Sequence, residues 1–216
     1  MDLTKRQTLQ GIAAAAAVVL LAAAQPTIAR DAVQPGKPAP EFAVKDASGK
    51  TVTLQSFKGK VVVLEWTNQD CPYVRKHYGT GNMQALQKEA TADGVVWLTI
   101  SSSAPGQQGH VTELEAEKLT ADRKAHPTAF LLDPSGTVGR AYGATVTPHM
   151  FVIDKAGVIA YMGGIDDKPT TNAADVKEAR NFVREALRAL AAGEPVKTAS
   201  ARPYGCSIKY SAEPRS

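Results

Sequence analysis

Short apolar runs alternate along the chain with longer segments in which apolar residues recur at helical spacing. Strands are expected at residues 51–54, 60–66, 95–100, 129–133, 150–154 and 158–162, the last two forming a hairpin. Helices are expected at residues 72–92, with an interruption at 79–81, at 111–123 and at 172–192. This alternation predicts an α/β domain in which helices cover a mixed sheet.

The predicted domain occupies residues 34–192, and a Pro- and Gly-rich arm at its start leads into the first strand. Residues 193–216 form a C-terminal tail that carries Cys206. We expect this tail to lack regular structure, except around residues 202–210.

The first thirty residues differ in composition from the rest. Lys5 and Arg6 precede an uncharged, mostly apolar run at residues 11–24, and small residues follow it. This order is typical of a signal peptide, so we expect residues 1–29 to be removed after export through the Sec or the Tat route. A spanning helix needs about 20 apolar residues, which leaves an uncleaved anchor as the alternative. The mature protein is expected in the periplasm.

Composition narrows the functional classes. Hydrophobic residues make up 44% and charged residues 21% of the chain, which suits a folded domain rather than a disordered one. Lys and Arg number 25 against 21 Asp and Glu, and the excess is spread along the sequence. Without a basic stripe, no nucleic-acid partner is expected.

The chain has two cysteines, Cys71 and Cys206. In an oxidising compartment such a pair is normally a disulfide, either structural or redox-active. Cys71 lies between a predicted buried strand and a helix that would begin at Pro72, a residue favoured at the first helical position. The helix N-terminus stabilises a thiolate, which favours a reactive Cys71. An inert half of a structural disulfide is the alternative, and closing so long a loop would contribute about 5 kcal/mol.

Four segments together resemble the redoxin group, the thioredoxin-fold proteins of the alkyl hydroperoxide reductase/thiol-specific antioxidant superfamily. They are residues 36–42, residues 54–60, the turn at 66–74 around Cys71, and the Thr147-Pro148 pair. Residues 205–210 also resemble the tail of a peroxiredoxin-like subgroup. The resemblance covers residues 34–192 and implies a thioredoxin-like, three-layer α/β/α fold and an oxidoreductase with a redox-active cysteine.

The chain departs from the family pattern around its nucleophile. Peroxiredoxins have Pro and Thr seven and three residues before the peroxidatic cysteine, where this chain has Leu64 and Asn68. A C-x-x-C pair is absent in either register, because Asn68 and Val74 occupy the two partner positions. Cys206 is therefore the thiol expected to resolve an intermediate on Cys71, within one chain or between chains.

Two further matches to the family concern supporting residues. Glu65 corresponds to the buried carboxylate of thioredoxins and is expected to move protons during exchange, with an ion pair to Lys or Arg as the alternative. Thr147 and Pro148 correspond to the cis-proline turn that faces the nucleophile and whose backbone can pair with a bound peptide. A trans loop proline is the alternative for this pair.

Three side chains near Cys71 are expected to contact substrate or sulfur. Trp66 and Tyr73 would wall the site, unless they pack in the core, and Asn68 would donate a hydrogen bond to the sulfur, unless it only makes a turn. We therefore assign Cys71, Cys206 and Glu65 to catalysis. The predicted substrate-binding residues are Trp66, Asn68, Tyr73, Thr147 and Pro148.

The sequence predicts an exported thiol oxidoreductase in which Cys71 attacks a peroxide or a protein disulfide and Cys206 resolves the intermediate. An external thiol would be the reductant, no bound cofactor is expected, and the oligomeric state is left open. One alternative is a non-catalytic binding module with a permanent Cys71–Cys206 disulfide. The other is a copper-binding protein, because copper chaperones of this superfamily use two cysteines and a histidine, for which His149 is the candidate here, although Thr67 stands where those proteins have a cysteine. His77 lies about 240° around a helix from Cys71 and is not expected to share a metal with it.

Overall fold

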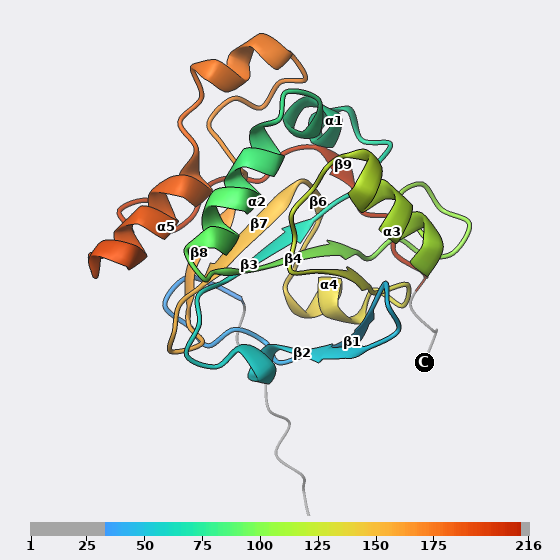
Figure 1. Ribbon diagram of the computed structural model, residues 1–216, viewed down its shortest axis with the longest axis horizontal. Helices are drawn as coiled ribbons and strands as arrows, with labels where there is room; N and C mark the ends of the chain where they lie inside the picture. Colours follow the sequence, from blue (N-terminus) through green and yellow to red (C-terminus); the bar gives the residue numbers. More distant parts are fainter. Residues whose placement is uncertain (1–32, 213–216) are drawn as a thin grey trace, which may run out of the picture. The chain divides into compact units, whose positions relative to one another are not determined.

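The computed structural model describes residues 33–212, so the predicted signal peptide, residues 1–29, lies outside the described residues. The main sheet has the strand order β2-β1-β5-β4-β3-β7-β8 (Figure 1). Adjacent strands are parallel between β3, β4 and β5 and antiparallel elsewhere, so the expected mixed sheet is confirmed. The strands are β1 (Ala43–Asp46), β2 (Thr51–Thr53), β3 (Val62–Trp66), β4 (Val96–Ser101), β5 (Ala129–Leu132), β7 (His149–Ile153) and β8 (Ile159–Gly163).

Helices lie on both faces of this sheet (Figure 1). Four of them cover one face. Three lie in the right-handed crossovers from β3 to β4 and from β4 to β5, which put their helices on the same side, and the fourth packs into the same core cluster. These are α1 (Pro72–Gly79), α2 (Asn82–Ala92), α3 (Glu113–Asp122) and α5 (Phe182–Ala192). The opposite face is covered by α4 (Thr137–Ala141), the 3₁₀ helix η1 (Leu54–Phe57) and the segment around Phe42. The three-layer α/β/α arrangement is thus confirmed.

Side chains of β3 alternate between the two faces. Val62, Leu64 and Trp66 belong to the core under α4 and η1, whereas Val63 packs with the helices on the other side. All five residues of β3 are buried, as expected for the central strand of a sheet covered twice. The alternation puts Glu65 on the face that also carries Cys71 and α1.

The long helix expected at residues 172–192 is two shorter elements. A 3₁₀ helix, η2 (Ala173–Lys177), is followed by an irregular link, and α5 begins only after Asn181. Asn181 breaks the continuous helix because its side chain accepts a hydrogen bond from the Arg184 N–H and caps α5. The Phe182 N–H donates a hydrogen bond to the Ile165 carbonyl, which connects the start of α5 to the residues just after β8.

As expected, the tail has no helix or strand between residues 193 and 201, and its one short strand lies within residues 202–210, but backbone hydrogen bonds fix it to the sheet. The Ala201 N–H donates to the Met162 carbonyl in the edge strand β8, and the Met162 N–H donates to the Ala199 carbonyl. Further on, β9 (Cys206–Ser207) pairs antiparallel with β6 (Val146–Thr147) in a separate two-stranded sheet. Ile208 is then buried in the core under α4. Of the described helices, none has the length and apolar character needed to cross a membrane.

Candidate active site

Cys71 is the N-cap residue of α1, at the end of the turn that follows β3. Asn68 shapes this turn, because its Oδ1 accepts a hydrogen bond from the Asp70 N–H at 2.8 Å and its carbonyl accepts from the Cys71 N–H at 3.1 Å. Pro72 begins the helix, as expected from its missing N–H. The sulfur is thereby placed at the positive end of the α1 dipole, but Cys71 is 0% exposed.

The turn between β6 and β7 faces this sulfur. The Thr147–Pro148 peptide bond is cis, which confirms that part of the sequence expectation. The Cys71 thiol donates a hydrogen bond to the Thr147 carbonyl at 3.1 Å. Thr147 is 1% exposed, so the contact is shielded from water. The turn predicted to face the nucleophile does so through its backbone.

Cys206 reaches the same place from the tail. It is the register partner of Thr147 in the β6–β9 pair, and its thiol contacts the thiol of Cys71. Both cysteines are free thiols in the structure. Gly205 makes this approach feasible, because a Cβ atom there would lie 1.9 Å from the Thr147 oxygen. Cys71 and Cys206, far apart in sequence, therefore form one dithiol site.

The two thiols have opposite pKa shifts. Burial by itself would raise the pKa of Cys71, but the polar groups facing the sulfur, first the Cys206 thiol and then the backbone N–H groups of Val74 and Cys206, outweigh it, and the pKa lies below its ordinary value. Burial and the neighbouring Cys71 sulfur raise the pKa of Cys206 to about 11. Cys71 is therefore the sulfur that ionises first, with the Cys206 S–H as a donor to it.

Glu65 is fully buried on the same sheet face as Cys71. Its carboxylate accepts four hydrogen bonds, at 2.8 to 3.2 Å, from Tyr78, Gln87, Trp97 and Thr99. Burial is the largest influence and raises the pKa of Glu65, although the donors oppose it. The donors come from α1, α2 and β4, and among the described residues neither a hydrogen bond to Cys71 nor an ion pair of Glu65 is found.

Two residues expected at the site lie elsewhere or act differently. Trp66 is on the opposite face of β3, where its ring packs between Tyr142 and Phe151 and its Nε1–H donates to Ser102 Oγ at 3.0 Å. It does not wall Cys71, because the alternation of side chains along β3 turns it away. Asn68 makes the turn described above, and its buried Nδ2 has no hydrogen-bond partner among the described residues.

Tyr73 lies on the first turn of α1, and its ring meets that of Tyr204 edge-on with centroids 5.7 Å apart. Tyr204 belongs to the tail, two residues before Cys206. The expected role of Tyr73 in substrate binding stays a prediction. A groove of about 550 Å³ lies beside this pair, and its lining includes Val146, Asp166, Phe182, Pro203, Tyr204 and Gly205.

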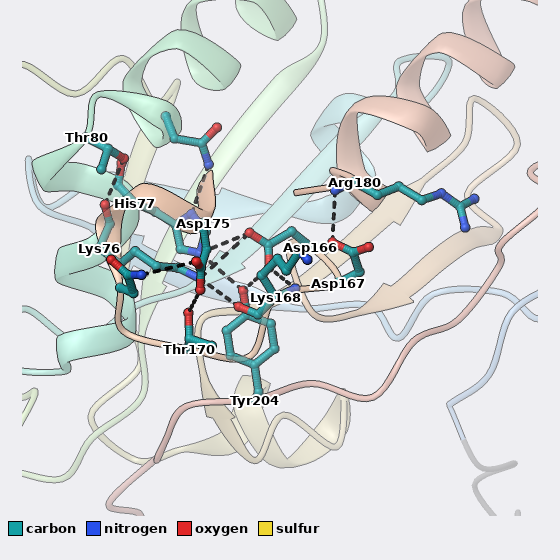
Figure 2. A network of polar contacts seen from close by, with 12 residues as sticks. Lys76, His77, Thr80, Asp166, Asp167, Lys168, Thr170, Asp175, Arg180 and Tyr204 are labelled. Carbon is teal, nitrogen blue, oxygen red and sulfur yellow. Dashed lines mark hydrogen bonds and ion pairs between the residues drawn. The ribbon is translucent and has the colours of Figure 1, made fainter. Parts of the chain in front are cut away.

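A buried polar cluster behind the dithiol was not anticipated from the sequence. It consists of Lys76, His77, Asp166 and Tyr204, which we call the Asp166 cluster (Figure 2). Residues from α1, from the loop after β8 and from the tail meet in it. The sequence shows that Lys76 and His77 follow Cys71 on the predicted helix. No sequence pattern indicates that Asp166 and Tyr204 pack against them.

The histidine considered for copper does not lie with the thiols. His149 stacks on Phe151, with ring centroids 4.7 Å apart, and so belongs to the α4 side of the sheet. Within residues 33–212, no three His, Cys, Asp or Glu side chains are grouped closely enough to hold a metal ion. The site as built offers two sulfurs, a buried carboxylate and a backbone acceptor, which is suited to thiol chemistry.

Comparisons with known proteins agree with this architecture. The family described as Redoxin matches residues 34–181. The thiol-disulfide oxidoreductase ResA of Bacillus subtilis (strain 168) is 26% identical over 132 residues, which cover 56% of this chain and 74% of ResA. The chain is also similar to the crystal structure of an uncharacterized conserved protein from Geobacillus kaustophilus, with a TM-score of 0.74, 26% identity and coverage of 85% and 96% of the two chains.

A further crystal structure, assigned as thiol:disulfide interchange protein DsbE from Chlorobium tepidum, has a TM-score of 0.55 and 23% identity. It covers 74% of this chain and 99% of its own. At that identity the likeness concerns the fold alone. The fold is the mixed α/β, thioredoxin-like one that the sequence resemblance implied.

Proposed function

The chain belongs to the Redoxin family, and from that premise we propose that it is a thiol-disulfide oxidoreductase whose redox pair is Cys71 and Cys206. The observation that carries the proposal is the contact between the Cys71 thiol, at a helix N-terminus, and the Cys206 thiol on β9. The similarity to ResA, which is named a thiol-disulfide oxidoreductase, supports the type of reaction.

In the proposed reaction, the Cys71 thiolate attacks one sulfur of a substrate disulfide. A bond forms between Cys71 Sγ and that sulfur, and the other substrate sulfur leaves as a thiolate. Cys206, once deprotonated, then attacks Cys71 Sγ, releases the second substrate thiolate and closes the Cys71–Cys206 disulfide. Two electrons have passed from the protein to the substrate, and an external thiol reductant returns them.

The surroundings of the pair support this order of events. The Cys71 thiol has the lower pKa, so it is the better nucleophile at neutral pH. Because the pKa of Cys206 is raised, its attack on the mixed disulfide requires a base. Glu65 is our candidate for this proton transfer, since it is buried on the same face and has a raised pKa. The Thr147–Pro148 turn is our candidate for holding the substrate backbone.

The experiment is turnover of a peptide disulfide in the presence of a small dithiol reductant. Wild-type protein should reduce the peptide, Cys71→Ser should not, and Cys206→Ser should accumulate a mixed disulfide on Cys71. Mild oxidation of the wild type should give a monomer with one Cys71–Cys206 bond, identified by peptide mass. No turnover with any of several disulfides and reductants would refute the proposal, and so would a disulfide formed only between chains.

Peroxide reduction is the finer alternative within the same site. There Cys71 would attack a peroxide oxygen, become a sulfenic acid and condense with Cys206, releasing water. Asn68 holds the position of the peroxidatic Thr and engages the Asp70 backbone rather than the sulfur. Turnover of hydrogen peroxide that is lost in Cys71→Ser would favour this reaction, and its absence would leave disulfide exchange.

A non-catalytic binding module with a permanent Cys71–Cys206 disulfide is the other alternative. The redox potential of that disulfide distinguishes it from a catalytic one. Structural disulfides typically have potentials below about −300 mV, and catalytic ones have higher potentials. We expect the Cys71–Cys206 pair above this limit, because the pKa of Cys71 is lowered and favours its release as a thiolate.

We further propose that the protein is exported and acts in the periplasm. The support is the signal-peptide pattern of residues 1–29, which lie outside the described residues. The N-terminal sequence of the mature protein tests it, and we expect a start at Arg30. An intact N-terminus in the cytoplasm would refute export.

A further inference from the structure

The tail covers the sulfur of Cys71. Cys71 is 0% exposed and packs with Cys206 and Tyr204 in one cluster, while the Thr147 carbonyl contacts its Sγ. A buried thiol does not react with an outside molecule until its sulfur is uncovered. Attack by Cys71 on an external disulfide therefore requires the segment before and at Cys206 to move away.

Tyr204 is the residue of this segment that makes a strong polar contact. Its hydroxyl donates a hydrogen bond to Asp166 Oδ1, in the loop that follows β8 (Figure 2). Its ring also lies over the Lys76 ammonium group, with Nζ 5.3 Å from the ring centroid. Tyr204 itself is only half-buried, so these contacts rather than complete burial hold it in place.

Asp166 depends on such donors because it is a carboxylate that is 3% exposed. Oδ1 accepts from the Lys168 N–H at 3.0 Å in addition to the Tyr204 hydroxyl. Oδ2 has no hydrogen-bond partner among the described residues and lies 3.9 Å from Lys76 Nζ. Loss of the Tyr204 hydroxyl would remove a donor from a buried charge, which opposes movement of the tail.

The same cluster contacts α1, the helix that begins next to Cys71. His77 Nε2 lies 3.3 Å from the Tyr204 hydroxyl, and the Asn82 amide lies 2.9 Å from His77 Nδ1. With Asn82 donating to Nδ1, Nε2 carries the proton and donates to the Tyr204 oxygen. Burial and the charge of Lys76 lower the pKa of His77 to about 3, so the ring stays neutral near pH 7. Both sulfur-bearing segments are thus fixed to one set of side chains.

We propose that Tyr204 and Asp166 form a latch that holds Cys206 against Cys71 and that must open before Cys71 can meet an external disulfide. The inference rests on the proposed function and adds how access to that site is controlled. Tyr204 and Asp166 are positioning residues, since they act through Cys206. Beyond Cys206, the buried Ile208 and the Tyr210 hydroxyl, which donates to the Ala144 carbonyl at 2.6 Å, keep the end of the tail attached as a pivot.

The rate at which a small alkylating reagent modifies Cys71 measures this opening. Tyr204→Phe, Asp166→Asn and the double variant would each be made in a Cys206→Ser chain, where Cys71 is the sole thiol. When reclosing is faster than alkylation, the rate is proportional to the open population. Tyr204→Phe should raise the rate about 10- to 100-fold, the factor for a hydrogen bond to a charged group.

The double variant shows whether Tyr204 and Asp166 act through one shared contact or influence the alkylation rate independently. If both substitutions break the same contact, the double variant should react about as fast as the faster single variant. The proposal would be overturned if the fold increase in the double variant equalled the product of the two single increases. It would also be overturned if Tyr204→Phe reacted at the rate of the Cys206→Ser parent. Tyr142→Phe is a matched control, because it removes a buried tyrosine hydroxyl that donates to the Pro40 carbonyl at 2.7 Å, and it should react like the parent.

Hydrogen exchange gives a second readout that does not need Asp166→Asn to fold. In Tyr204→Phe, the amide of Ala201, which donates to Met162, should exchange faster while the amides of β3 and β4 keep their protection. Equal protection of Ala201 in both proteins would contradict the latch. Alkylation of Cys71 does not depend on turnover, so the two proposals can fail separately. If the latch variants change the alkylation rate but the protein reduces no disulfide, the proposed function alone is refuted. If the protein reduces disulfides but the latch variants leave the alkylation rate unchanged, the latch alone is refuted.

Discussion

Cys206 lies opposite Thr147 in the β6–β9 pair, and its thiol meets the thiol of Cys71, whose hydrogen bond to the Thr147 carbonyl is 3.1 Å long. The thiol at the helix N-terminus and the thiol from the tail thus lie side by side, the first buried and the second partly exposed. In the proposed function this pair takes the role of a local C-x-x-C pair, although no second cysteine is near Cys71 in sequence.

The Cys206 thiol should control the ionisation of Cys71. Its S–H is the leading hydrogen bond that lowers the pKa of Cys71, so Cys206→Ala should move the midpoint of Cys71 alkylation to higher pH. Cys206→Ser keeps a donor at the same position and should move the midpoint less. The pH dependence of alkylation rate, measured on both variants, checks this. Identical midpoints for the two variants would contradict a hydrogen bond from residue 206.

Gly205 should be essential for docking of the tail. Its φ is +133°, and a Cβ would lie 1.9 Å from the Thr147 backbone oxygen, which cannot move as a flexible side chain would. Gly205→Ala should therefore slow formation of the Cys71–Cys206 disulfide at least about tenfold, because the effective concentration of the two thiols falls. The rate of disulfide formation in a glutathione buffer measures it.

Gly49→Ala is the control for Gly205→Ala. Gly49 also has a positive φ, +82°, but a Cβ there meets nothing within 4 Å. It should cost some stability from backbone strain and leave disulfide formation unchanged. If both variants slow the reaction equally, general destabilisation and not the contact with Thr147 is responsible.

Glu65→Gln should slow thiol exchange by about 10²-fold, the lower range for loss of a general base. The amide keeps the size of the side chain but neither accepts a proton nor satisfies all four donors around it. We therefore also expect a loss of about 1–3 kcal/mol in unfolding free energy. Single-turnover rates on the folded variant give the first effect. A rate equal to that of the wild type would remove Glu65 from the mechanism.

The pH dependence of stability gives Glu65 a separate signature. Burial raises its pKa in the folded state, so the protonated form favours folding. That stabilisation is complete below the ordinary pKa of 4.5 and is lost as the pH rises through the folded-state pKa. The difference in unfolding free energy between wild type and Glu65→Gln should therefore shift against the wild type over this range. Denaturant unfolding at a series of pH values measures it.

Trp66→Phe should lower the stability of the fold without changing the reactivity of Cys71. It removes the indole hydrogen bond to Ser102 and leaves a cavity between Tyr142 and Phe151, so the unfolding free energy should fall by about 1–3 kcal/mol. The alkylation rate of Cys71 should stay that of the wild type, because Trp66 lies on the other face of β3. A changed rate would mean that the two faces are coupled through the sheet.

The layered α/β fold, the position of Cys71 between strand and helix, and the Thr147–Pro148 turn could be predicted from the sequence, because each depends on residues that are neighbours in the chain. Apolar runs, the Cys-Pro pair and the Thr-Pro pair act locally, and short-range sterics and hydrogen bonds decide them. The side of β3 on which Trp66 and Glu65 lie was also implicit in the alternation along a strand.

The remaining features depend on contacts between segments that are distant in the chain. Residues 193–212 are held in place by contacts with β8, β6 and α4. No local sequence pattern predicts these contacts. The meeting of Cys71 with Cys206, and of Asp166 with Tyr204, joins segments far apart in the chain. Such contacts exist only once the sheet has placed those segments together, because burial, and not sequence proximity, makes their hydrogen bonds and charges strong.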